Sequence, residues 1–264
     1  MSDIHVIAGP GRTVPHPEIR RIDAADLKDS LRQGYADFAE FPSFAVFLCL
    51  IYPIIGFALG GLVFGTNMLP LAFPFAAGFA LVGPIAALAL YEMSRQREAG
   101  RVPDIGHAFD VVKSPSMPAI LAVSALLIAL FVVWVATAQA LHTAIMGPVW
   151  TDDPAEFIRN ILTTREGWTL IVAGNLVGAL FAVVAFVIGV VSFPLLLDRD
   201  VGALAAVTTS VRAVAANPGT MALWGIIVAG LLVLGSIPFF LGLAVVMPLL
   251  GHATWHLYRK VVAR

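Results

Sequence analysis

The sequence predicts an all-α integral membrane protein with six transmembrane helices, and three observations lead to this fold class. The chain of 264 residues is 59% hydrophobic and only 12% charged, whereas about 25% of the residues in an ordinary soluble domain are charged. Several apolar stretches reach the roughly 18 residues that a helix needs to cross a bilayer. Lysine and arginine are concentrated in alternate connecting segments. This composition excludes a soluble globular enzyme, because too few charged side chains exist to cover a water-exposed surface.

Each expected span is a continuous apolar stretch. The third, Met117–Met146, contains no charged residue at all. The long apolar stretch that follows residue 218 is divided in two by Gly235-Ser-Ile-Pro238, where a tight turn is expected. The predicted spans are residues 43–65, 68–91, 117–146, 168–192, 219–236 and 238–257.

The distribution of positive charge predicts the topology. Fourteen of the 16 lysine and arginine residues lie before the first span, after the sixth, or in the segments that join spans two to three and four to five. The alternate segments carry only Arg159 and Arg165. By the positive-inside rule, both termini are therefore cytoplasmic. Residues 1–22 are expected to form a flexible cytoplasmic tail, without a signal-peptide pattern, and residues 23–264 a single membrane domain.

A repeated pattern precedes the odd-numbered spans. Each instance is an amphipathic helical stretch that ends at a proline, and each even-numbered span has a second proline inside or near its cytoplasmic half. The pattern predicts three helical hairpins around a pseudo-threefold axis, each preceded by a surface helix in the cytoplasmic headgroup layer. Six helices with ordinary proline kinks are the alternative. The apolar stripes are Leu27, Leu31, Tyr35 and Phe38, then Ile105, Ala108, Phe109 and Val112, then Leu204, Val207, Val211 and Val214; the repeat prolines are Pro42, Pro115, Pro218, Pro84, Pro194 and Pro248.

Two helix starts carry capping signals. Asp23 can cap the first surface helix, with Asp26 three positions later resembling a capping box. In the outer segment, Asp153 can cap a helix whose first residue is Pro154, and Glu156 can complete the box. We expect a short periplasmic surface helix over residues 154–165, with an apolar stripe facing the membrane.

Two motifs resemble a known family. They are Pro194-Leu-Leu-Leu-Asp-Arg-Asp-Val-Gly, continuing to Ser210-Val-Arg-Ala-Val-Ala-Ala-Asn-Pro-Gly, and the C-terminal Pro248-Leu-Leu-Gly-His-Ala-Thr-Trp-His-Leu-Tyr-Arg. They are similar to a family of predicted proteobacterial six-helix inner-membrane proteins of unknown function, over residues 25–264. The resemblance implies a location in the bacterial inner membrane. Some members are named as cytochrome c oxidase subunit I-like, which implies a respiratory link but supplies no mechanism.

The histidines suggest a metal site. His252 and His256 are four residues apart, so both project from one helix face. Under the repeat, Glu92 and Asp198 occupy positions equivalent to His256 and His252, and His107 lies in a nearby loop. Carboxylates with imidazoles suit a divalent transition metal. The alternative is a set of polar side chains at the cytoplasmic membrane interface, and no other cofactor is expected.

Small-residue pairs predict helix packing. GxxxG spacing lets two helix backbones approach closely where lipid offers no hydrophobic driving force. The candidate helix-packing residues are Gly56, Gly60, Gly61, Gly65, Gly174 and Gly178.

The predicted function follows from where charge is missing. The middle of every span lacks charged residues, which argues against ion-coupled transport, and no nucleophile–base pair or phosphate loop suggests an enzyme. The sequence favours a non-catalytic accessory or assembly partner of a larger membrane complex, with a respiratory complex preferred. The alternative is a small-solute transporter or channel along the pseudo-threefold axis. Expected partners are the lipid bilayer and a membrane protein or a second copy, but no nucleic acid, because the net charge is −1.

Overall fold

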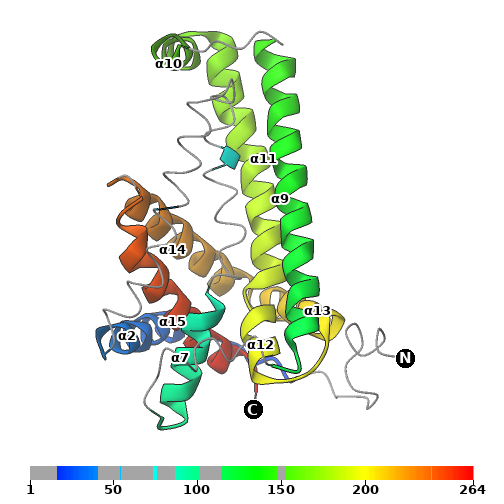
Figure 1. Ribbon diagram of the computed structural model, residues 1–264, viewed down its shortest axis with the longest axis vertical. Helices are drawn as coiled ribbons and strands as arrows, with labels where there is room; N and C mark the ends of the chain where they lie inside the picture. The colour runs from blue at the N-terminus through cyan, green and yellow to red at the C-terminus, as the bar shows by residue number, and fades with distance from the viewer. Residues whose placement is uncertain are drawn as a thin grey trace. The chain divides into compact units, whose positions relative to one another are not determined.

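The computed structural model describes residues 17–40, 54, 74–75, 87–101, 114–147, 153–238 and 240–263, and every regular element in them is helical (Figure 1). The chain divides into two compact units. The first comprises Met1–Pro53, Gly83–Ala125 and Phe186–Arg264, and the second comprises Ile54–Val82 and Leu126–Ala185.

The first unit holds most of the helices. They are α2 (Ala24–Glu40), α7 (Leu88–Glu98), α12 (Ser192–Asp198), α13 (Ala203–Ala216), α14 (Pro218–Ser236) and α15 (Leu243–Val261), together with the start of α9 (Met117–Met146) and the end of α11 (Arg165–Gly189). The second unit holds the rest of α9 and α11, and α10 (Pro154–Thr163) between them.

Three helical segments in the described residues are long and apolar enough to cross a membrane: Met117–Met146, Arg165–Asp198 and Pro218–Ser236. They correspond to the third, fourth and fifth predicted spans, and the limits of the third are those predicted. Most of the first and second predicted spans lies outside the described residues. The sixth span was expected at residues 238–257, but α15 begins only at Leu243 and carries Arg259 and Lys260 in its last turn. It is not among the three long apolar segments.

The turn between α14 and α15 is longer than predicted. The described residues of this turn are 237, 238 and 240–242, and Phe240 has a positive φ of 64°. Gly242 packs directly on Gly235, because a Cβ on Gly242 would lie 2.7 Å from the Gly235 carbonyl oxygen. The Gly235–Pro238 signal therefore located the turn, but the close approach of two glycines sets where α15 begins.

Pro194 explains the break between α11 and α12. A proline has no N–H, and its ring clashes with the carbonyl four residues earlier, so a regular helix cannot continue through Val190. The chain turns at residues 190 and 191 instead. Ser210 of α13 bridges the break: its hydroxyl donates to the Val187 carbonyl (2.7 Å) and accepts from the Val191 N–H (3.2 Å).

The N-terminal end of α2 is fixed by hydrogen bonds. Asp23 and Asp26 each accept from the other's backbone N–H, at 3.0 and 3.1 Å, which confirms the predicted capping box. Just before it, Ile19 forms an antiparallel bridge with Val262, and Asn217 binds both the Ile22 N–H and the Arg20 carbonyl. Residues 17–22, which were predicted to belong to a flexible tail, are thus hydrogen-bonded to the C-terminal end of the chain and to the start of α14.

Helix α2 lies across α15 (Figure 1). Gly34 makes the crossing possible, since a Cβ there would lie 2.5 Å from the backbone nitrogen of Ala253. The buried face of α2 consists of Leu27, Ser30, Gly34 and Asp37. The predicted apolar stripe is therefore only partly correct: Leu27 is buried, but Tyr35 is 63% exposed.

Helix α13 buries small and polar side chains. Its buried residues are Ala206, Thr209, Ser210 and Ala213. The predicted apolar stripe is turned away from the rest of the unit only in part: Leu204 is 58% and Val211 43% exposed, whereas Val207 and Val214 are half-buried.

In the second unit, α9 packs against α11 through an aromatic contact. The centres of the Trp134 and Phe181 rings lie 5.5 Å apart. Gly178 leaves room for the Trp134 ring, because a Cβ on residue 178 would lie only 3.0 Å from a carbon of that ring. Between the two helices, Asp153 accepts from the Ala155 N–H and caps α10, which confirms the predicted start of that helix. Helix α10 ends at Thr163 rather than at the predicted residue 165, because the Thr164 hydroxyl accepts from the Gly167 N–H at the start of α11.

Candidate functional site

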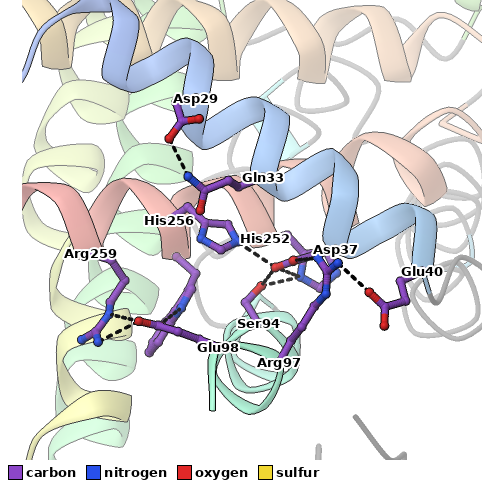
Figure 2. Close-up of polar contacts among 11 residues, drawn as sticks. Asp29, Gln33, Asp37, Glu40, Ser94, Arg97, Glu98, His252, His256 and Arg259 are labelled. Atoms are coloured by element: carbon purple, nitrogen blue, oxygen red, sulfur yellow. Dashed lines mark hydrogen bonds and ion pairs between the residues drawn. The ribbon is translucent and has the colours of Figure 1, made fainter. Parts of the chain in front are cut away.

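Polar side chains from three helices meet in the first unit, where α2, α7 and α15 pack together (Figure 2). We call this group the polar cluster; it consists of Asp37 and Glu40 of α2, Ser94 and Arg97 of α7, and His252 and His256 of α15.

Asp37 is the centre of the cluster. It is only 5% exposed. One carboxylate oxygen accepts from the Ser94 hydroxyl (2.6 Å) and from His256 Nε2 (2.8 Å), and the other accepts from Arg97 Nη1. Arg97 also pairs with Glu40 at 2.6 Å. One buried carboxylate therefore binds donors from both neighbouring helices.

The hydrogen-bond directions follow from the carboxylate. A carboxylate only accepts, so the Ser94 hydroxyl donates to Asp37 and its oxygen is left to accept from His252 Nδ1, which lies 2.8 Å away. This network assigns the neutral His252 ring as the Nδ1–H tautomer. Its Nε2 atom is buried and has no hydrogen-bond partner among the residues that the structure describes.

A second network, centred on Arg259, joins α15 to α7 and α12. Arg259 donates to Glu98 at 2.9 and 3.1 Å and to Asp198 at 3.0 Å. Tyr258 donates to the same Asp198 oxygen at 2.6 Å, and Trp255 donates to Glu98 at 3.2 Å. Together with the hydrogen bond between His256 and Asp37 of α2, these contacts tie the C-terminal half of α15 to three other helices of its unit.

An open cleft of about 550 Å³ lies between the two networks. Charged residues on its wall are paired: Lys260 lies 2.7 Å from Asp29, which also accepts from Gln33 at 2.5 Å. The residues that line the cleft are Gln33, Ala36, Asp37, Ser94, Arg97, Glu98, His256, Arg259 and Lys260.

These contacts shift the pKa values of the charged groups. Burial alone would raise the pKa of Asp37, but the hydrogen bonds from His256, Ser94 and Arg97 outweigh burial and hold the pKa below its ordinary value. The hydrogen bond with Asp29 raises the pKa of Lys260, and the same pair lowers the pKa of Asp29. Burial would lower the pKa of Arg259, yet its contacts with Glu98 and Asp198 raise it. These directions keep Asp37, Asp29, Lys260 and Arg259 charged at neutral pH.

The predicted metal ligands do not gather at one point in the described part of the chain. His252 and His256 do share a face and meet around Asp37. Glu92, however, accepts from Arg95 at 2.7 and 2.9 Å within its own helix, and Asp198 binds Tyr258 and Arg259. His107 lies outside the described residues. Within those residues, no group of three or more His, Cys, Asp or Glu side chains is arranged to hold a metal ion.

The other predicted residues are also placed only in part. Gly178 packs on Trp134, whereas Gly174 has open space around it. Gly56, Gly60, Gly61 and Gly65, with Pro42 and Pro84, lie outside the described residues. Pro248 lies inside α15, Pro115 precedes α9 and Pro218 begins α14. The surface helix expected over residues 105–112 is not described, so the threefold repeat stays a prediction.

Asp37, Ser94 and Arg97 were not predicted as site residues. A usable signal exists for Asp37: together with Leu27, Ser30 and Gly34 it recurs on one helical face. A carboxylate on a face of small and apolar residues indicates a buried partner.

Comparison with known proteins supports the membrane assignment. No curated protein and no solved structure matches the chain. The chain is an integral membrane protein whose described residues form only helices as regular elements, and its residues 72–198, a little under half of its length, match a family described as predicted integral membrane protein (DUF2189).

Proposed function

We propose that this chain is a non-catalytic protein of the bacterial inner membrane that acts as an accessory or assembly partner of a larger membrane complex. The proposed topology has six spans in three hairpins, with both termini in the cytoplasm. The observation that supports the proposal best is the pairing within the polar cluster: the Asp37 carboxylate accepts hydrogen bonds from three donors on α7 and α15.

This pairing favours a scaffolding role over a reactive one. A catalytic group has to reach a substrate, whereas Ser94 and His252, the two groups that resemble a nucleophile and a base, are 1% exposed. The hydrogen bonds of Asp37 instead connect three helices. Removing any one partner would leave buried polar groups unpaired, so the arrangement favours a fixed packing of these helices.

The lipid-accessible surface offers room for a partner. Helices α9, α11 and α14 expose long apolar faces, which face lipid or the helices of another membrane protein. Examples are Val133, Leu176, Leu180, Ile226 and Val233, all more than half exposed. The resemblance to proteins named after an oxidase subunit makes a respiratory oxidase the first complex to test.

The test is purification of the tagged full-length chain from its native membrane in a mild detergent, with subunit stoichiometry measured by quantitative mass spectrometry. The proposal expects the subunits of one complex at a fixed ratio to the chain. The same tag on an unrelated inner-membrane protein is the control. A lone monomer or homotrimer would contradict the proposal, and solute flux by that species in vesicles would support the transporter alternative. Elemental analysis of the same sample is expected to find no stoichiometric metal.

A further inference from the structure

Helix α13 presents an unpartnered apolar face within its unit. Leu204 and Val211 are exposed and Val207 is half-buried, at spacings of three and four residues that place them on one side of the helix. The opposite side is buried and holds Thr209 and Ser210. A helix that buries Thr209 and Ser210 while it exposes Leu204 and Val211 is suited to an apolar environment on its outer side.

The chain connections restrict which environment this is. Four residues, 199–202, separate the candidate span Arg165–Asp198 from α13, and one residue separates α13 from the span Pro218–Ser236. Four extended residues reach at most about 14 Å, and Asn217 alone forms the other link. Both ends of α13 are therefore held beside membrane-spanning helices.

Hydrogen bonds fix the orientation of the helix. Ser210 binds the Val187 carbonyl and the Val191 N–H at the cytoplasmic break of the preceding span, and Asn217 binds the Ala213 carbonyl and the Arg20 carbonyl. These contacts lie on the buried side, so the apolar side is directed outward.

The charges agree with a lipid environment. No charged residue interrupts the stripe of Leu204, Val207 and Val211, and the exposed Arg212 lies at its edge. An arginine beside an apolar stripe can extend its guanidinium to the headgroups while its stem stays among apolar groups. We propose that α13 lies in the plane of the bilayer with Leu204, Val207 and Val211 inserted at the boundary between headgroups and acyl chains. This inference is independent of whether the protein has a partner complex.

The experiment uses the full-length chain in vesicles of phosphatidylethanolamine and phosphatidylglycerol. Cys49 is replaced by alanine, and nitroxide labels are attached to Leu204→Cys or Val211→Cys, with Arg212→Cys as the matched control on the same helix. Spin-label collision rates with oxygen and with a water-soluble nickel complex are then compared. We expect oxygen to dominate at positions 204 and 211, and nickel access to be several-fold higher at position 212.

Two results would overturn the inference. If the labels at positions 204 and 211 collide more often with the nickel complex than with oxygen, the stripe lies in water. If they collide rarely with either reagent, protein covers the stripe. A second probe avoids the cysteine background: Leu204→Trp in vesicles with brominated acyl chains should lose most of its added fluorescence, and absence of quenching would contradict insertion.

Discussion

Helices α2 and α13 have the same sequence pattern but meet different surroundings. The first residue of the predicted apolar stripe is Leu27 in α2, where it is 1% exposed, and Leu204 in α13, where it is 58% exposed. Both helices nevertheless bind the protein through small or polar residues, Gly34 and Asp37 in α2 and Ser210 in α13. The comparison shows that an apolar stripe in a membrane protein identifies a helix but not the side that packs on protein, since lipid satisfies an apolar face as well as protein does.

The largest expected effect concerns the polar contacts of α2. Asp37→Ala removes a buried carboxylate and leaves Arg97, Ser94 and His256 without their acceptor, so we expect a loss of about 3–5 kcal/mol in the free energy of unfolding. Unfolding in mixed detergent micelles, followed by circular dichroism, measures it. Glu40→Ala is the control, because Glu40 contacts the same Arg97 from an exposed position and should cost less than about 1 kcal/mol. If the two changes lower the free energy of unfolding equally, then the buried position of Asp37 does not increase its contribution to stability.

Equivalent leucines provide a direct comparison of the two stripes. Leu27→Ala should destabilise the protein by about 2–4 kcal/mol because it leaves a cavity between helices. Leu204→Ala should change the free energy of unfolding by less than about 0.5 kcal/mol, because lipid or detergent fills the space. The same micelle titration measures both. A large cost at Leu204 would show that a protein surface covers α13.

Loss of the polar contact of α13 should cost less free energy of unfolding than loss of the Asp37 contacts of α2, because the α13 contact involves no charged group. Ser210→Ala leaves the Val187 carbonyl and the Val191 N–H at the break without a partner, and we expect a cost of about 1–3 kcal/mol. Thr208→Ala is the control, since the Thr208 hydroxyl binds only carbonyls of its own helix. If the two variants are equally stable, then Ser210 does not stabilise the α11–α12 break.

The smallest expected effect is the dependence on pH. The pKa of Asp37 is lower in the folded protein than its ordinary 3.8. Its contribution to stability is therefore present above about pH 4 and is lost as the pH falls through the folded pKa. Unfolding midpoints measured between pH 7 and pH 3 should fall more steeply in the parent chain than in Asp37→Asn. Parallel curves would contradict a lowered pKa at this residue.

Local signals in the sequence predicted local structure well. The limits of α9, the reciprocal capping of α2 by Asp23 and Asp26, and the cap of α10 by Asp153 depend on neighbouring residues only, and all three are confirmed. The resemblance to a membrane-protein family is supported over residues 72–198.

Long-range contacts were beyond the sequence patterns. The pair His252 and His256 was identified from its spacing, but Asp37, which accepts from His256, comes from a helix more than 200 positions earlier in the chain. Pro194 was identified only as one of the repeat prolines, and nothing local indicated that the chain would turn at residues 190 and 191 or that Ser210 would bridge this break. Apolar periodicity gave too little weight to Gly34 and Asp37, because small and charged residues do not contribute to an apolar stripe.

The central claim is that the Asp37 carboxylate joins α2 directly to its neighbours. A double-mutant cycle of Asp37→Asn and Arg97→Gln tests it most directly, with the free energy of unfolding as the readout. We expect the two changes to be coupled by about 1–3 kcal/mol, as for side chains in direct contact within one network. Additivity within about 0.5 kcal/mol would contradict the claim.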